Sequence, residues 1–103
     1  MNVEVNRDGN ILTIKISGRL DTVSCGQLEQ QIAAVFDDDI GQVILDLDGL
    51  EYVVSSGLRI LLRLYRRLAM NGSLLLVNVS DYVYEILEMT GFAEMLAIER
   101  KTL

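Results

Sequence analysis

The stretch EYVVSSGLRILLRLYRRL, residues 51–68, changes its pattern of apolar residues partway along. It opens with a short apolar run. After two serines and a glycine, its apolar residues recur every three or four positions, as they do on one face of a helix. The apolar face of this predicted helix comprises Leu58, Leu61, Leu62, Tyr65, Leu68 and Ala69. An Asn-Gly-Ser segment at residues 71–73 is expected to end the helix.

Strand and helix patterns also alternate before this stretch. Apolar and polar residues alternate in ILTIKIS, residues 11–17, as in a half-buried strand, and the NRDGN turn before it predicts a first strand near residues 3–5. A helix of about four turns is expected from Thr22, because apolar residues follow at helical spacing. The mostly apolar run QVILDLDGL, residues 42–50, predicts a strand buried on both faces.

Two further strands and a helix are expected after the quoted stretch. LLLVNV, residues 74–79, predicts a buried strand, and Ser80 or Asp81 can cap a third helix that ends at Gly91. A last short strand is expected at residues 96–99. This order predicts an α/β fold in which helices pack beside a mixed sheet, with Leu61 and Leu62 both facing the sheet. Without a linker or internal repeat, residues 1–103 are expected to form a single domain.

Composition argues against several functions. The chain has 15 Asp and Glu against 9 Lys and Arg, and a net charge of −6 disfavours binding to nucleic acid or to an anionic membrane. It has no histidine, so no Ser-His or Cys-His catalytic pair can form, and it lacks the glycine motifs that hold nucleoside phosphates. The aspartates at residues 37–39 lack the spacing of a calcium loop. We therefore expect no enzyme activity, no cofactor and no metal site.

The chain carries no feature of export. Its single cysteine, Cys25, cannot form an intrachain disulfide and falls on an apolar helix face, where a buried thiol is expected. The first ten residues lack the apolar segment of a signal peptide, and no apolar run is long enough to cross a bilayer. These features predict a cytoplasmic protein without membrane insertion.

The serines at the junction have two interpretations. The side chain of Ser55 or Ser56 can cap the helix by accepting from an unpaired backbone N–H group of the first turn. Alternatively, a hydroxyl at a helix N-terminus is a favourable place for an added phosphate, which makes it a candidate switch. Gly57 permits close approach of the backbone, which suits either tight packing or the access of a partner.

Basic residues cluster on the same predicted helix. Four of the nine Lys and Arg residues lie there at spacings of three and four, namely Arg59, Arg63, Arg66 and Arg67. They form either a solvated face paired with nearby carboxylates or a surface that meets an acidic partner or a phosphoserine.

Together, several segments resemble a STAS domain of the bacterial anti-sigma factor antagonist type. VILDLDGL at residues 43–50 precedes SSGLRILL at residues 55–62, and GSLLLVNVSDYVYEILEMTGF follows at residues 72–92. SGRLD, residues 17–21, resembles the segment before the first helix of the family. The resemblance covers nearly the whole chain. It implies a STAS-like α/β fold with a mixed sheet of four to five strands.

The resemblance also implies a partner and a switch. The partner is an anti-sigma factor with serine kinase activity that carries its own ATP site, and its capture releases a sigma factor. The phosphate acceptor of the family matches Ser55, with Ser56 as an alternative. Phosphorylation is expected to abolish binding. Where the family commonly has aspartate, this chain has Val54. The chain is therefore either a member that phosphorylation switches off or a member that binds its partner without this switch.

The expected partner-binding surface combines the junction with the loop before the first helix, which the resemblance implies to lie nearby. It comprises Asp21, Ser55, Ser56, Gly57, Leu58, Arg59 and Arg63. The alternative is a STAS module that is not phosphorylated and serves as a structural or regulatory subunit of a transporter-associated complex. The sequence leaves the oligomeric state open.

Overall fold

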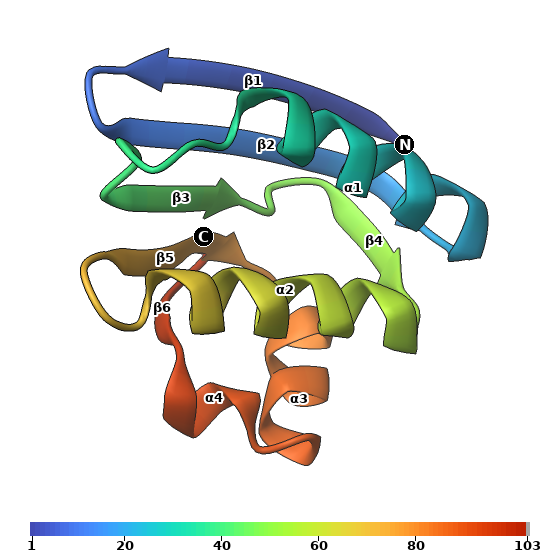
Figure 1. Cartoon of the computed structure of the whole chain (residues 1–103). Coiled ribbons are helices and arrows are strands. Elements are labelled where there is room, and N and C mark those ends of the chain that lie inside the picture. Colours follow the sequence, from blue (N-terminus) through green and yellow to red (C-terminus); the bar gives the residue numbers. More distant parts are fainter. Residues whose placement is uncertain (103) are drawn as a thin grey trace.

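A computed structural model describes residues 1–102 of the chain (Figure 1). The strands in this part are β1 (Asn2–Asp8), β2 (Ile11–Leu20), β3 (Gln42–Asp46), β4 (Leu50–Val53), β5 (Ser73–Val79) and β6 (Ala97–Arg100). The helices are α1 (Thr22–Val35), α2 (Ser55–Leu68), α3 (Asp81–Met89) and α4 (Phe92–Met95). Every strand and helix predicted from the sequence is present, and β4 and α4 are additional.

The strands form a mixed sheet, which confirms the predicted fold class. β1 and β2 make an antiparallel hairpin, and the main strand order is β1-β2-β3-β5-β6 with the remaining pairs parallel. β4 lies outside this order and pairs in parallel with the end of β2, after a register shift between Gly18 and Arg19. The sheet therefore has six strands, one more than the upper limit predicted.

The apolar run at residues 42–50 is not one continuous strand. β3 ends at Asp46, whose Oδ1 accepts a hydrogen bond of 3.0 Å from the backbone N–H of Asp48. Gly49 then adopts a φ of 83°, a backbone conformation that favours glycine, and the chain turns into β4. This turn sends β4 toward the end of β2 and away from the centre of the sheet.

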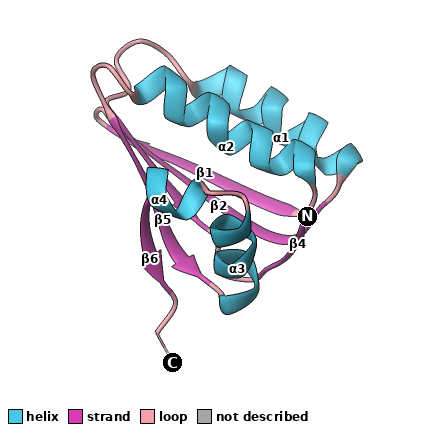
Figure 2. Cartoon of the chain, turned by 90° about the horizontal axis from the view of Figure 1, so that it is seen from below, coloured by secondary structure: helices cyan, strands magenta, loops and turns pink. Residues whose placement is uncertain are grey.

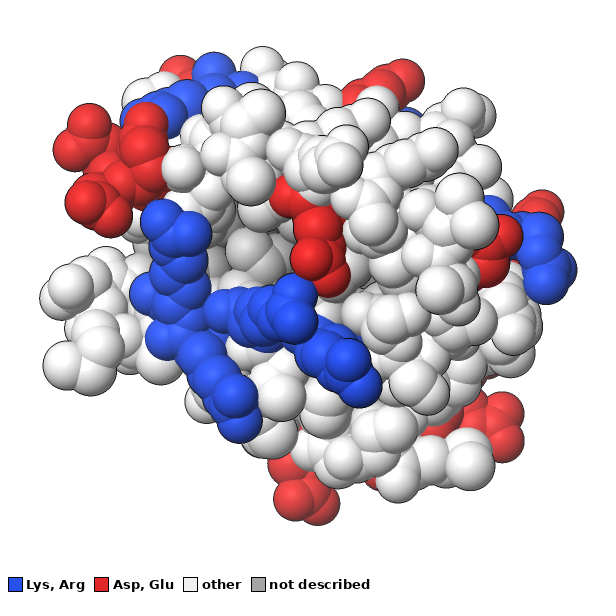
Figure 3. All heavy atoms as spheres, turned by 45° about the vertical axis from the view of Figure 1, so that its right-hand side comes forward, with Lys and Arg blue, Asp and Glu red and all other residues white. Residues whose placement is uncertain are grey.

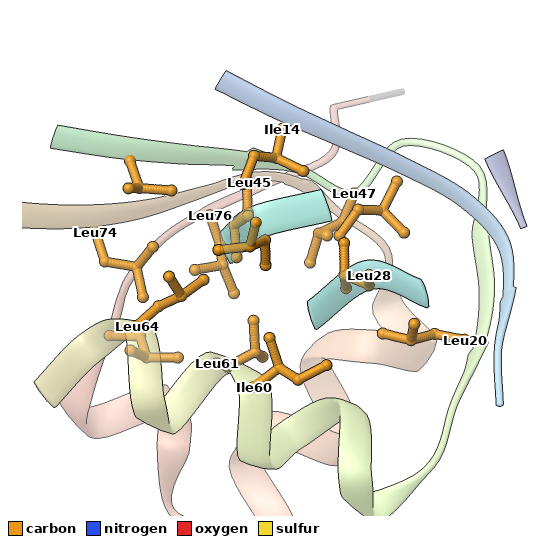
Figure 4. Close-up of a cluster of buried hydrophobic side chains, with 14 of the residues drawn as sticks. Ile14, Leu20, Leu28, Leu45, Leu47, Ile60, Leu61, Leu64, Leu74 and Leu76 are labelled. Atoms are coloured by element: carbon orange, nitrogen blue, oxygen red, sulfur yellow. The ribbon is translucent and has the colours of Figure 1, made fainter. Parts of the chain in front are cut away.

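The core lies between the sheet and the helices α1 and α2, which pack side by side on one face (Figure 2). Leu45 and Leu76 of the central strands point toward Ile60, Leu61 and Leu64 of α2 (Figure 4). All five side chains are buried, and full burial of such a side chain contributes about 1.5–3 kcal/mol. Packing against the sheet thus fixes the position of α2.

Burial on the two faces of the sheet is unequal. Val43 and Leu45 of β3 are buried under the helices, whereas Ile44 between them points to the opposite face and is only half-buried. The expectation that this strand is buried on both faces is therefore wrong. Leu62 is also only half-buried, so the expectation that it faces the sheet together with Leu61 is wrong as well.

Candidate partner-binding site

The N-termini of α1 and α2 meet at one end of the molecule (Figure 1). The backbone N–H of Val54 donates a hydrogen bond of 3.1 Å to the carbonyl oxygen of Leu20. Asp21 and Ser55 directly follow these two residues in the chain. The pairing of β4 with β2 therefore brings together the two segments that the sequence analysis assigned to one surface.

Ser55 is the first residue of α2 and is exposed, whereas Ser56 is half-buried. The N-cap position belongs to Val54, and no side chain caps the helix. The backbone N–H groups of Gly57 and Leu58 instead approach the carbonyl oxygen of Val54 at 2.9 and 3.3 Å. The interpretation of the serines as helix caps is therefore wrong. The Ser55 hydroxyl lies at the positive end of the helix dipole and is accessible from solvent.

Gly57 holds the first turn of α2 close to the sheet. It is buried, and a Cβ atom at this position would lie 2.7 Å from Val53 Cγ2 and 2.9 Å from Leu20 Cδ2. Both distances are shorter than real carbon contacts allow. The structure thus gives Gly57 a packing role, and this packing holds Ser55 at the end of the molecule.

Asp21 caps α1. Its Oδ1 accepts hydrogen bonds from the backbone N–H of Ser24 at 3.0 Å and from the Ser24 hydroxyl at 2.9 Å, and its own N–H donates to Ser24 Oγ at 2.8 Å. This is a capping box, in which both residues satisfy unpaired donors. The hydrogen bonds from Ser24 hold the pKa of the Asp21 carboxyl below its usual value. The sequence signal for this cap is the aspartate followed three residues later by a serine, and the cap was not predicted.

Two groups beside the site were not predicted. Val23, in the first turn of α1, is 74% exposed although it is apolar. The guanidinium of Arg19 lies 4.2 Å from the centroid of the Tyr52 ring, which joins the end of β2 to β4. Exposed apolar and aromatic groups next to polar ones are common at protein interfaces. The exposure of Val23 could have been predicted from the sequence, because Val23 lies outside the apolar stripe of its helix.

The four arginines of α2 do not share one environment. Arg59 is exposed and lies one turn beyond Ser55, next to the half-buried Leu58. Arg63 donates a hydrogen bond of 3.0 Å to Glu29 of α1, as the solvated-face interpretation expects. Arg67 stacks on Phe36, with its guanidinium 4.2 Å from the ring centroid. Basic side chains gather on this face beside a hollow in the surface (Figure 3).

The acidic run at residues 37–39 has a structural role. Asp37 pairs with Arg7 of β1 at 2.6 Å and accepts a hydrogen bond of 2.9 Å from the backbone N–H of Asp39. The hydrogen bond from Arg7 lowers the pKa of the Asp37 carboxyl. Within residues 1–102, no group of three or more His, Cys, Asp and Glu side chains is placed to hold a metal ion.

The mixed sheet with helices packed beside it agrees with the fold that the resemblance implies. The model of the STAS domain family matches residues 2–102, and the chain belongs to this family. No helix within residues 1–102 combines the length and the apolar composition that crossing a membrane requires.

Similar proteins carry the name of one functional class. The chain is 29% identical over 99 residues to the putative anti-sigma factor antagonist BtrV of Bordetella bronchiseptica, covering 95% of this chain and 85% of that protein. It is 23% identical over 103 residues to the anti-sigma-B factor antagonist of Staphylococcus aureus, covering 99% and 95% of the two chains. A crystal structure of an anti-sigma factor antagonist from Mycobacterium paratuberculosis superimposes with a TM-score of 0.85 at 26% identity, covering 95% of this chain and 84% of that one.

Proposed function

We propose that this protein is an anti-sigma factor antagonist, which binds an anti-sigma factor and thereby releases a sigma factor. The similar proteins that carry this name support the proposal. The observation that carries it is the exposed Ser55 hydroxyl, which caps nothing and stands where α1 and α2 begin. We assign the partner surface to Asp21, Ser55, Ser56, Leu58 and Arg59, with Gly57 as a positioning residue and Arg63 at the edge. Val23 extends this surface with an apolar side chain.

In this proposal the anti-sigma factor is also a serine kinase, and Ser55 accepts its phosphate. Phosphorylation adds about two negative charges and three acceptor oxygens to a surface shaped for a neutral hydroxyl. The added charge must be desolvated when the partner binds, so binding is lost. Ser56 is the weaker candidate for the acceptor, because its side chain is half-buried.

The proposal assigns the chain a regulatory role without catalysis of its own. A chain without histidine is consistent with this role. An antagonist of this kind works where sigma factors meet RNA polymerase, so we place it in the cytoplasm. We also propose that residues 1–103 act as one STAS domain without a cofactor.

Val54 favours a second candidate function. The resemblance implies aspartate at this position, which is the N-cap of α2 in the structure. If valine marks loss of phosphorylation, the chain is a STAS module that works as a fixed subunit of a larger assembly, for instance one associated with a transporter.

Phosphate incorporation separates the two functions. The wild type, Ser55→Ala and Ser56→Ala are incubated with the anti-sigma factor of the same organism and ATP, and mass spectrometry then counts the phosphates. We expect one phosphate on the wild type and on Ser56→Ala, and none on Ser55→Ala. Loss of the phosphate in Ser56→Ala alone would show that Ser56 is the acceptor. A wild type that binds the factor but takes up no phosphate would contradict the switch.

A further inference from the structure

A groove lies between α1 and α2, toward the C-terminal halves of both helices. Its volume is about 290 Å³, and it is lined by Glu29, Ile32, Ala33, Phe36, Ile60, Arg63, Leu64 and Arg67. Ile32, Ile60 and Leu64 are buried, so they form an apolar floor. Arg63 and Arg67 stand at the edge, about 12 and 18 Å from Ser55 along the helix. We call this feature the α1–α2 groove.

The edge of the α1–α2 groove already binds a carboxylate. Arg63 Nη1 lies 3.0 Å from Glu29 Oε1, with 59% of the Arg63 side chain and 46% of the Glu29 side chain exposed. An ion pair this exposed is weak and can exchange with another carboxylate at little cost. The guanidinium of Arg67 stacks on the Phe36 ring. Within the described part of the chain, Arg67 has no ion-pair partner. Arg67 also lines a neighbouring hollow with Asp37 and Asp38, of which Asp37 pairs with Arg7. The edge of the α1–α2 groove therefore offers one anion position at Arg63, which Glu29 occupies, and one at Arg67.

Charge and size decide which occupant suits the groove. The chain as a whole carries −6, which repels a long polyanion such as nucleic acid and also a second copy of this chain. A short segment mainly meets the charges at the groove edge, because exposed charges more than about 10 Å away are largely screened at about 0.1 M salt. Two arginines one helical turn apart instead match two neighbouring carboxylates of a short segment. Between these carboxylates, the segment can place an apolar side chain in the groove, where contact with the apolar floor would remove it from water.

We propose that the α1–α2 groove docks an acidic segment of the anti-sigma factor, an inference that rests on the proposed function. An apolar side chain of this segment fills the hollow, and its carboxylates bind Arg63 and Arg67. The segment displaces Glu29 from Arg63. Glu29 thus competes with the partner, and it holds Arg63 in position while the groove is empty.

The groove is a second contact, separate from the switch at Ser55. Sites more than about 10 Å apart that share no partner residue usually contribute additively to the free energy. A phosphate on Ser55 therefore weakens the first contact without occupying the second. Changes at Ser55 and at Arg67 are expected to multiply their effects on the dissociation constant.

The experiment compares two neighbouring arginines. Arg67→Glu and Arg66→Glu change the net charge equally, but Arg66 does not line the groove. Isothermal titration with the purified anti-sigma factor measures binding, and thermal melts check the fold. We expect Arg67→Glu to weaken binding about tenfold and Arg66→Glu to weaken it less than about threefold. Glu29→Gln should instead tighten binding about twofold, because it frees Arg63.

The possible failures are distinguishable. No binding by the folded wild type would overturn the proposed function itself. Binding that is weakened by Ser55→Asp but responds equally to Arg67→Glu and Arg66→Glu would overturn the groove while leaving the function intact. Sedimentation of the wild type, Arg66→Glu and Arg67→Glu tests whether a second copy of this chain occupies the groove. Self-association of the wild type that Arg67→Glu disrupts and Arg66→Glu does not would show such a copy, and would overturn the proposed occupant.

Discussion

At the scale of single residues, Val54 determines how α2 begins. A helix N-terminus has unpaired N–H groups, which an aspartate or serine at the N-cap usually satisfies. The side chain of valine cannot accept a hydrogen bond, and it packs against the core instead. The first turn of α2 therefore keeps donors that an anion on Ser55 can reach.

Replacing Val54 tests how much stability a side-chain cap would add to α2. Val54→Asp adds a capping carboxylate but removes apolar packing, and Val54→Ala removes the packing alone. We expect Val54→Asp to be more stable than Val54→Ala by about 1 kcal/mol, because its carboxylate accepts from the first turn and suits the helix dipole. Urea unfolding at pH 7 measures the difference. Equal stabilities would mean that the first turn of α2 is already satisfied without a cap.

The sequence correctly placed the serines at the start of a helix, but the helix cap, one of the two roles it offered for them, is absent. A pair of serines before a helix pattern is a common cap signal. The structure starts the helix one residue earlier than a Ser55 cap requires, because Val54 N–H is held by the carbonyl of Leu20. This hydrogen bond joins segments more than thirty residues apart, so no local pattern reveals it.

At the scale of elements, α1 and α2 begin in different ways. The capping box of Asp21 and Ser24 closes α1, whereas α2 begins without a side-chain cap. The carboxylate of Asp21 is the accepting group, so this cap depends on pH.

The stability of α1 should fall in acid. The hydrogen bonds from Ser24 lower the pKa of Asp21 in the folded state, so its contribution is complete above the unfolded pKa of about 4. It is lost as the pH falls below that value through the folded pKa. Asp21→Asn keeps a capping oxygen that does not titrate. Urea unfolding between pH 6 and pH 3 should therefore show the advantage of the wild type over Asp21→Asn shrinking toward acid. A constant difference would contradict the cap.

Two neighbouring leucines of α2 should respond differently to truncation. Leu61 is 7% exposed, and Leu61→Ala should destabilise the fold by about 2–5 kcal/mol because it leaves a cavity. Leu62 is half-buried, and Leu62→Ala should cost less than about half as much, since solvent can fill the space. Thermal and urea unfolding measure both variants. Equal losses would place Leu62 in the core after all.

The elements that the sequence missed are short and depend on distant contacts. α4 has four residues, too few for a helical repeat to appear. β4 also has four residues, and its partner is the end of β2 beyond a register shift, so its pairing is decided by the fold. The longer elements carry their own periodicity and were predicted. The prediction for Leu62 was wrong because the buried face of α2 is formed by Gly57, Ile60, Leu61, Leu64 and Leu68. Leu62 lies about 100° further around the helix from Leu61, at the side of this face.

At the scale of the whole molecule, the sheet holds α1 and α2 in parallel with their N-termini at one end (Figure 1). That end carries Asp21, Val23 and Ser55, and the opposite half of the helix pair carries the α1–α2 groove. The two features therefore lie on one continuous helical layer. A partner that spans this layer can contact Ser55 at one end and the α1–α2 groove at the other.

The proposed switch requires that charge on Ser55 controls binding of an anti-sigma factor. The most direct measurement is the dissociation constant of Ser55→Asp for that factor, with Ser73→Asp as the matched control. Ser73 is exposed at the start of β5, beyond the other end of α2, so the control adds the same charge away from the site. We expect Ser55→Asp to keep its fold and to bind at least about tenfold more weakly, a loss of about 1.4 kcal/mol, while Ser73→Asp binds like the wild type. A folded Ser55→Asp that binds as tightly as Ser73→Asp would contradict the proposed switch.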